Sequence, residues 1–313
     1  SCTAALSLFR RPLPYPPDER GRMTTCSTLP DIFADPESCW PQWLDACRVG
    51  DDASAAAYEA APPAQRAALK TGLALMAQYF GRPTAQQSGG WRDPFSGFWQ
   101  EEHRCPAPWA VVAFTPAYAA AARLTAACLP ALLAQVPLLG AVCVGSQGQT
   151  PTPQALLALE LAGVEDVFSL DEAALCRLLE ETQPGPGRLV LLHKGELDIA
   201  AQTARHLHIP CYEERYAPAL ALPQPDLFDM EALVLAHGEG CVKRARTAAL
   251  PESPAAIYTT PEAARAHCHL SADRPFGRGA APLALTPGCE GFWLHDGLTP
   301  DFFALRRAAF GLL

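Results

Sequence analysis

The chain has 313 residues, of which 49% are hydrophobic and 18% are charged, and these proportions predict a globular protein with a sizeable core. The formal net charge of -9 argues against nucleic acid or an anionic membrane surface as the main partner. The longest apolar stretch, residues 117–144, contains an arginine and two prolines, so we expect no transmembrane helix.

The cysteines point to a reducing compartment. All twelve are scattered singly, and no two of them form a Cys-x-x-Cys pair. The proline-rich N-terminus has no basic segment followed by an apolar one, so it does not resemble a signal peptide. We therefore expect reduced thiols and a cytoplasmic protein.

The first third of the chain predicts helices followed by a loop region. Residues 51–80 are rich in alanine, with leucines near helical spacing, and predict one or two helices. Residues 81–108 are rich in glycine, proline and aromatics, which is typical of a crossing loop or of short antiparallel strands.

From Trp109 onward, short apolar runs alternate with helical segments. Strands are predicted at 109–114, 140–144, 164–170, 187–192 and 208–212. Helices are predicted up to Ala134, at 153–162, at 172–181 with Asp171 as N-cap, and up to His206. The ending LTPDFFALRRAAFGLL predicts an amphipathic helix whose apolar side chains the core or a second subunit of a homodimer would cover.

This alternation predicts an α/β protein with a mostly parallel, doubly wound (Rossmann-like) sheet, helices on both faces and a second, smaller lobe. We expect an N-terminal arm and helical region at 1–107, the Rossmann-like domain at 108–216 and the second lobe at 217–313. Sheets of this kind bind ligands at the carboxyl ends of their strands, which are followed here by loops 115–118, 145–151, 193–198 and 213–218.

Cys241 is the candidate nucleophile. Two glycines precede it, and three basic side chains follow it, namely Lys243, Arg244 and Arg246. A cationic neighbourhood favours the reactive thiolate, and backbone amides of a tight turn can stabilise an oxyanion. The alternative is that Cys241 is a small apolar side chain, like the other cysteines of the chain.

Candidate bases are Glu213 and Glu214, which follow the last predicted strand, and His237, four residues before Cys241. Surface glutamates at strand ends are common without a catalytic role, so the structural interpretation stays open for both. A metal site built from His206, His208 and Cys211, or from residues 267–269, is the weaker hypothesis because the spacings only approximate those of zinc ligands. We predict no metal.

Four segments resemble the aldehyde dehydrogenase superfamily, which includes histidinol dehydrogenase. PWAVVAFTPAY matches the position of its strand with a Pro-Trp-Asn turn, and LPALLAQVPLLGAVCVGSQGQTP matches the next helix, strand and loop. ALLALELAGVEDVFSLDEAALCRLL is similar to a stretch of histidinol dehydrogenase. HGEGCVKRAR resembles the nucleophile loop, with Gly238, Glu239, Cys241 and Arg246 at the matching positions.

The resemblance implies an aldehyde or alcohol dehydrogenase-like oxidoreductase that acts on a small molecule with NAD or NADP. Cys241 then attacks the aldehyde, and a nearby carboxylate activates the deacylating water. The cofactor is expected to lie against Thr115, Pro116, Gly145, Ser146, Gly195 and Glu196.

The sequence departs from the family pattern at the cofactor and oxyanion positions. Tyr118 stands where the family has the turn asparagine, Gly145 where it has a lysine, and no Gly-x-Gly-x-x-Gly follows any predicted strand. Glu196 and Asp198 put carboxylates in the turn where phosphate charge is expected. The alternative function is therefore a catalytically degenerate relative that serves as a small-molecule-binding or protein-interaction module.

Overall fold

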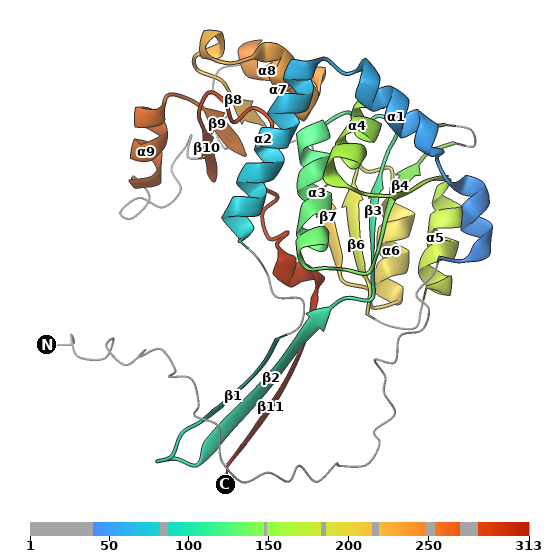
Figure 1. Cartoon of the computed structure of the whole chain (residues 1–313), viewed down its shortest axis with the longest axis vertical. Helices are drawn as coiled ribbons and strands as arrows, with labels where there is room; N and C mark the ends of the chain where they lie inside the picture. The colour runs from blue at the N-terminus through green and yellow to red at the C-terminus, as the bar shows by residue number, and fades with distance from the viewer. Residues whose placement is uncertain are drawn as a thin grey trace, which may run out of the picture. The chain divides into compact units, whose positions relative to one another are not determined.

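The protein is described by a computed structural model that covers residues 40–81, 87–146, 149–182, 186–214, 219–247, 254–269 and 281–312. The predicted N-terminal arm lies outside these residues. The main element of the described structure is a five-stranded parallel sheet of order β5-β4-β3-β6-β7 (Figure 1). The strands are β3 (Trp109–Phe114), β4 (Leu138–Val144), β5 (Asp166–Leu170), β6 (Arg188–Leu192) and β7 (Cys211–Glu214).

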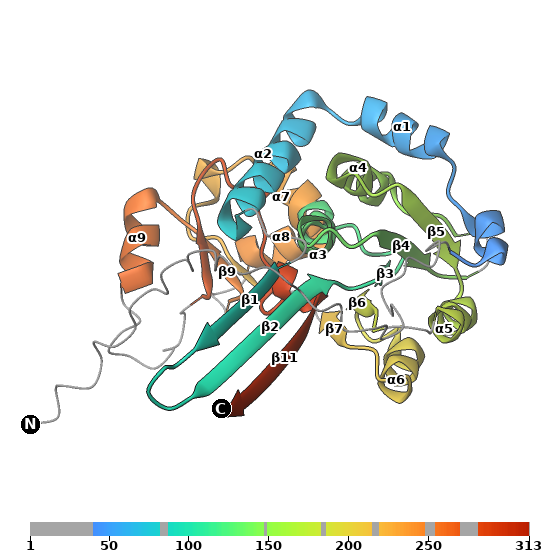
Figure 2. The same cartoon turned by 60° about the horizontal axis from the view of Figure 1, so that its bottom comes forward.

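Helices cover both faces of this sheet because successive strand residues point to opposite sides. Val112 and Phe114 of β3 belong to one apolar cluster, whereas Val111 and Ala113 belong to a second. In Figure 2, α3 (Ala121–Leu133) and α4 (Pro153–Ala162) lie on one side of the sheet, and α5 (Glu172–Glu181) and α6 (Asp198–His206) on the other. The predicted doubly wound α/β fold is confirmed.

The helix termini follow their local sequence. Thr152 caps α4 by accepting a hydrogen bond from the amide of Ala155. Asp171 caps α5 by accepting one from the amide of Ala174, which confirms the predicted N-cap. Before the sheet, the chain forms a short 3-10 helix η1 (Gln42–Cys47), α1 (Asp51–Ala60) and α2 (Pro63–Phe80).

The strand order reverses beside β3. The chain runs from β3 outward to β4 and β5, then returns to the other side of β3 for β6 and β7. The carboxyl ends of β3 and β6 therefore lie at the point where connections diverge to opposite faces, and such a point leaves a crevice for a ligand.

The smaller lobe is built around a three-stranded parallel sheet of order β10-β9-β8. Its strands are β8 (Leu220–Ala221), β9 (Ala256–Tyr258) and β10 (Leu283–Leu285). The 3-10 helix η2 (Pro225–Leu227), α7 (Met230–His237), α8 (Glu239–Thr247) and α9 (Pro261–His269) belong to the same part of the chain. The domain boundaries at 108 and 217 stay predictions.

The C-terminal helix prediction is wrong. Pro300–Phe303 forms a 3-10 helix, η3, and Ala304–Leu312 is the strand β11, which pairs antiparallel with β2 (Phe98–Pro106). β2 in turn pairs with β1 (Gln87–Arg92), so the predicted short antiparallel strands are confirmed. Nine consecutive residue pairs with β2 outweigh the helical pattern that the isolated segment suggests.

The last strand of the large sheet also differs from its prediction. The predicted strand began at His208, but this residue has a positive φ of 54° and lies in a turn. β7 starts at Cys211 and includes Glu213 and Glu214 as its final residues. His206 ends α6, so His206 and His208 do not share a strand face. Among the described helices, none has the length and apolar character that crossing a bilayer requires.

Candidate active site

A cavity of about 310 Å³ lies at the divergence point of the sheet. The loop after β3, the loop after β6 and the junction of α7 and α8 all contribute residues to its lining. Its lining residues are Thr115, Ala117, Tyr118, Ala119, Ala120, Arg123, His193, Lys194, Glu196, Glu214, His237, Gly238, Glu239, Gly240, Cys241 and Arg244.

Cys241 is the third residue of α8 rather than part of an irregular turn. Gly238 separates α7 from α8 with a φ of 83°, a left-handed conformation that favours glycine, and its carbonyl accepts hydrogen bonds from the amides of Cys241 and Val242. The side chain of Cys241 lines the cavity although the residue is only 6% exposed. Its sulfur is therefore at the cavity wall and protected from bulk water.

The guanidinium of Arg123 is the central group of the site. Arg123 lies in the first turn of α3 and is 1% exposed. Its Nη2 donates to the Sγ of Cys241 at 3.2 Å and to the carbonyl of His237 at 3.1 Å, and its Nε donates to Nδ1 of His237 at 3.3 Å. Its Nη1 lies 3.5 Å from Oε1 of Glu214.

A second guanidinium contacts the same sulfur. Nη2 of Arg244, one turn along α8, lies 3.4 Å from Sγ of Cys241. Cys241 therefore accepts from two cations, one buried and one exposed. Cationic donors of this kind stabilise a thiolate relative to the thiol.

Glu214 joins the sheet to the arginine. Its Oε2 lies 2.8 Å from Nδ1 of His295, and its Oε1 accepts from the hydroxyl of Tyr118 at 3.3 Å. Burial raises the pKa of Glu214, but the hydrogen bond and charge of His295, together with Arg123, outweigh it and hold the pKa below its usual value. Glu214 is therefore ionised at neutral pH.

His237 is fixed with both ring nitrogens engaged. Nδ1 accepts from Arg123, so the proton of the neutral ring is on Nε2, which contacts the hydroxyl of Tyr258. Burial, with the charge of Arg123, holds the pKa of His237 well below its usual value. In this arrangement neither nitrogen is available to the thiol of Cys241.

Glu213 points to the other side of the strand from Glu214 and is absent from the cavity lining. Its Oε1 lies 3.1 Å from Nε2 of His193, and its Oε2 lies 3.7 Å from Arg205. Nδ1 of His193 accepts from the amides of Gly195 and Leu197, so Nε2 carries the proton and donates it to Glu213.

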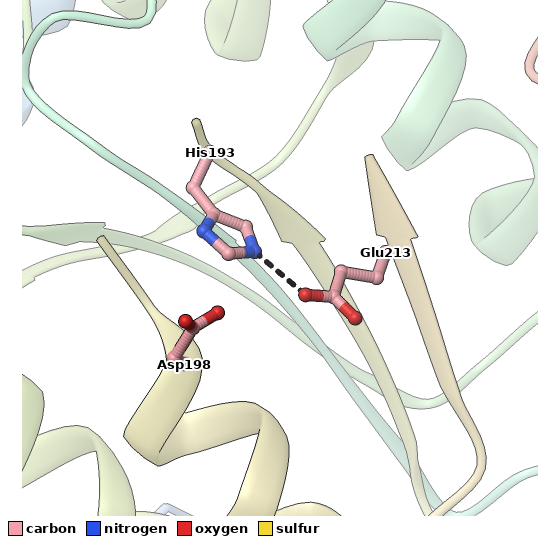
Figure 3. A group of neighbouring side chains, drawn as sticks. All are labelled: His193, Asp198 and Glu213. Atoms are coloured by element: carbon pink, nitrogen blue, oxygen red, sulfur yellow. Dashed lines mark hydrogen bonds and ion pairs between the residues drawn. The ribbon is translucent and has the colours of Figure 1, made fainter. Parts of the chain in front are cut away.

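His193, Asp198 and Glu213 are grouped closely enough to suggest a metal site (Figure 3). His193 directly follows β6, Asp198 is the first residue of α6, and Glu213 lies in β7. A metal ion needs a lone pair on Nε2 of His193, but the two amides that donate to Nδ1 keep the proton on Nε2. The group does not fit a metal ion in this tautomer.

In the turn between β6 and α6, which is predicted to bind the cofactor, backbone amides donate hydrogen bonds to side chains of the same turn. The amide of Lys194 donates to Oε2 of Glu196 at 2.6 Å, and the amide of Gly195 donates to His193. The first turn of α6 is capped from α5, because Oε1 of Glu172 accepts from the amides of Ile199 and Ala200 at 3.0 and 3.1 Å. A helix N-terminus that already holds a carboxylate does not fit a dinucleotide phosphate.

Of the other residues predicted to bind the cofactor, one lines the cavity and three do not. Thr115 lines the cavity, whereas Pro116, Gly145 and Ser146 do not. A Cβ on Gly145 would lie 2.6 Å from Cγ of Pro116, so this glycine allows two strand-end loops to pack against each other. The amide of Ser146 donates to Oε1 of Gln149.

Of the ten residues predicted for the site, five line the cavity, namely Thr115, Glu196, Glu214, His237 and Cys241. Sequence reasoning missed Arg123, His193 and His295. Arg123 had a signal, since it is the one charged residue in the apolar stretch 117–144. His295 had none, because its role depends on contacts with Glu214 and with the carbonyl of Arg123, 172 positions away.

The comparisons with known proteins identify the fold. No protein-family model matches the chain, and no curated protein matches it in sequence. The structure is similar to histidinol dehydrogenase from Elizabethkingia anophelis, with a TM-score of 0.55 and 11% identity over 85% of this chain and 77% of that one. The predicted resemblance to the aldehyde and histidinol dehydrogenase superfamily is thus confirmed as a similarity of fold.

Aldehyde dehydrogenases are more distant matches. The enzyme from Brucella melitensis biovar abortus 2308 has a TM-score of 0.34 and 16% identity over 75% of this chain. Succinate-semialdehyde dehydrogenase from Burkholderia pseudomallei has a TM-score of 0.33 and 14% identity over 77% of this chain. The chain spans 57% of the length of each of these two proteins.

Proposed function

We propose that the protein binds a small aldehyde in the cavity at the divergence point of the sheet and attaches it reversibly to Cys241. One observation carries this proposal: the sulfur of Cys241 faces a cavity while two guanidinium groups donate to it. A buried cysteine that served only as an apolar side chain would need neither the cavity nor the cations.

The chemistry follows from the donors around the sulfur. The thiolate adds to the carbonyl carbon, the π electrons of the C=O bond move to oxygen, and that oxygen takes a proton from water to give a thiohemiacetal. The first amides of α8, those of Glu239 and Gly240, have no partner within their own helix because of their position at its N-terminus. They are the expected donors to the oxyanion.

A second hollow gives the ligand further room. It has a volume of about 510 Å³ and shares Ala119, Gly238 and Glu239 with the first. Met230 and Val234 of α7 contribute apolar walls, and its charged lining residues are Glu231 and Glu239. We therefore expect an aldehyde with a partly apolar tail that carries no negative charge.

The second candidate function is oxidation of the aldehyde with NAD or NADP, as the sequence resemblance implies. The similarity to the fold of histidinol dehydrogenase and the position of the cavity favour it. The turn between β6 and α6 favours the first candidate, because Glu172 already occupies the amides where the phosphates are expected.

Protection from alkylation tests the aldehyde-binding proposal. Iodoacetamide labels Cys241, and peptide mass spectrometry measures the rate at this residue. We expect propanal to slow the labelling of Cys241, and propan-1-ol, which cannot form the adduct, to leave the rate unchanged. With ¹³C-labelled propanal, the sp³ adduct signal should be present in the native protein and in Cys143→Ser, whose thiol is outside the cavity lining, and absent in Cys241→Ser.

Lack of protection, together with an adduct signal that persists in Cys241→Ser, would contradict the proposal. The same samples, supplied with NAD or NADP, separate the two candidates through the appearance of NADH or NADPH. Reduced cofactor that forms in the native protein and not in Cys241→Ser would establish the second candidate instead.

A further inference from the structure

The ring of His295 connects two chain segments that hold the site. It comes from the segment after β10, and its side chain is 2% exposed. Nε2 lies 2.8 Å from the backbone carbonyl of Arg123, and Nδ1 lies 2.8 Å from Oε2 of Glu214. It thereby attaches the first turn of α3 to the end of β7.

Both neighbours of this ring are hydrogen-bond acceptors. A backbone carbonyl can only accept, so Nε2 carries a proton. Glu214 is ionised, since its partners hold its pKa below the usual range, so its oxygen also only accepts and Nδ1 carries a second proton. The ring of His295 is therefore an imidazolium cation.

The buried groups around the site then carry an excess of positive charge. Arg123 and His295 are two cations whose side chains are 2% exposed, and the carboxylate of Glu214 is one anion beside them. His237 is neutral because its pKa is held far below the usual value, and the hydroxyl of Tyr118 is neutral because burial and the charge of Glu214 raise its pKa. An unbalanced buried charge is strongly destabilising, because the low-dielectric interior does not solvate it.

Among the described groups that line the cavity, the buried thiol of Cys241 is the one that can become an anion and cancel that charge. The sulfur of Cys241 accepts from Arg123, the same guanidinium that bridges to Glu214. The remaining titratable groups around the cavity are Lys194, Glu196, Glu239 and Arg244, which are exposed to solvent, and His193, which is a neutral donor to Glu213. On the far side of His295, Tyr212 packs against the ring, and burial raises the pKa of this tyrosine to about 12.

We propose that His295 is a positioning residue that keeps Cys241 as a resting thiolate, with the imidazolium and the thiolate balancing each other across the Arg123–Glu214 bridge. Cys241 loses its proton to water and the imidazole gains one, so the buried group of four side chains is neutral. The proposal concerns the sulfur of the proposed aldehyde site, but its test uses no aldehyde, so either can fail without the other.

The pH dependence of alkylation tests this proposal in the full-length protein. The rate of labelling of Cys241 by iodoacetamide should be nearly constant from about pH 6 to about pH 9, because a resting thiolate does not depend on pH there. In His295→Gln, which keeps hydrogen-bonding atoms and loses the charge, we expect a rate roughly tenfold lower near pH 6.5 and rising with pH. His267→Gln is the matched control, since this part-buried histidine also contacts a backbone carbonyl, that of Ala281, and is outside the cavity lining.

A merely structural role would slow labelling by the same factor at every pH, and that result would overturn the proposal. A native rate that climbs with pH in parallel with the other cysteines would overturn it too. If His295→Gln does not fold, the coupling is tested with the opposite variant, Cys241→Ser, in which NMR of the imidazole nitrogens reports the protonation of His295. In Cys241→Ser the anion is gone, so the signal of the doubly protonated His295 ring at neutral pH should be weaker than in the native protein, and an unchanged signal would refute the coupling.

Discussion

Arg123 shows how one residue determines the geometry of the site. A cation in the first turn of a helix opposes the helix dipole, and burial adds a desolvation cost. The structure offsets both with acceptors on three other segments, at Glu214, His237 and Cys241. Such an arginine cannot shift without leaving several polar groups unpaired, so it fixes the separation between α3, β7 and the junction of α7 and α8.

Gly238 is the backbone counterpart of this arginine. Because its φ of 83° is left-handed, Gly238→Ala should lower the free energy of unfolding by about 1–2 kcal/mol, even though no atom within 4 Å blocks a Cβ. Urea denaturation measures the effect.

Gly240 provides the matched comparison for that substitution. It lies inside α8, has no positive φ and also has open space around it. Gly240→Ala should therefore raise the free energy of unfolding by about 0.5–1 kcal/mol, because alanine is the better helix former. Equal effects of the two substitutions would show that the junction places no demand on the backbone.

At the scale of elements, periodicity was sufficient for the central sheet. The five strands are short apolar runs buried on both faces, and the helices between them begin at recognisable caps such as Thr152 and Asp171. The periodicity predicted the wrong structure for β11 because pairing with β2, a strand about 200 residues earlier in the chain, determines the conformation of this segment. The local sequence of a segment does not specify which distant strand it pairs with.

The site was predictable where it depended on strand ends and on one motif. Cys241 and Glu214 could be named because topology gathers loops at the carboxyl edge and because basic residues follow the cysteine. Arg123 looked like an interruption of an apolar run, and His295 has no motif around it. Their roles depend on contacts between distant segments, which a single sequence does not specify.

The capping of α6 by Glu172 leads to a prediction about nucleotide binding. Glu172→Ala removes the carboxylate from the amides of Ile199 and Ala200, so it should cost about 0.5–2 kcal/mol of stability and raise the affinity for NAD and NADP. Thermal unfolding with and without each cofactor measures both effects.

Asp171→Ala is the control for this experiment. Asp171 caps the neighbouring helix α5, so its loss should destabilise the protein by a similar amount without opening the N-terminus of α6. If both variants bind the cofactor no better than the native protein does, Glu172 is not what prevents binding.

For the whole molecule, two buried groups make stability depend on pH in the same direction. The pKa of His237 is well below its ordinary 6.5, so as the pH falls below about 6.5 the unfolded chain takes up a proton that the folded chain does not. The pKa of Glu214 is also below its ordinary 4.5, so its contribution is present above that pH and is lost as the pH falls through the folded value. We expect the free energy of unfolding to fall steadily from neutral pH downward.

Urea denaturation at a series of pH values checks this expectation. His237→Gln should flatten the upper part of the curve, above about pH 4.5, and leave the acid limb in place. The exposed His206, replaced in the same way, serves as the control. A stability that is constant between pH 7 and pH 5 in the native protein would contradict the assignment of His237 as a buried neutral ring.

The position of His295 along the chain has a consequence for biosynthesis. During translation, Arg123, Glu214 and Cys241 are synthesised before His295. Until the later segment docks, the partly made chain has the sulfur without the imidazolium that balances it, so the cysteine stays a dormant thiol. Activation of the sulfur would then coincide with completion of the core, which spares the growing chain from premature reaction with cellular electrophiles.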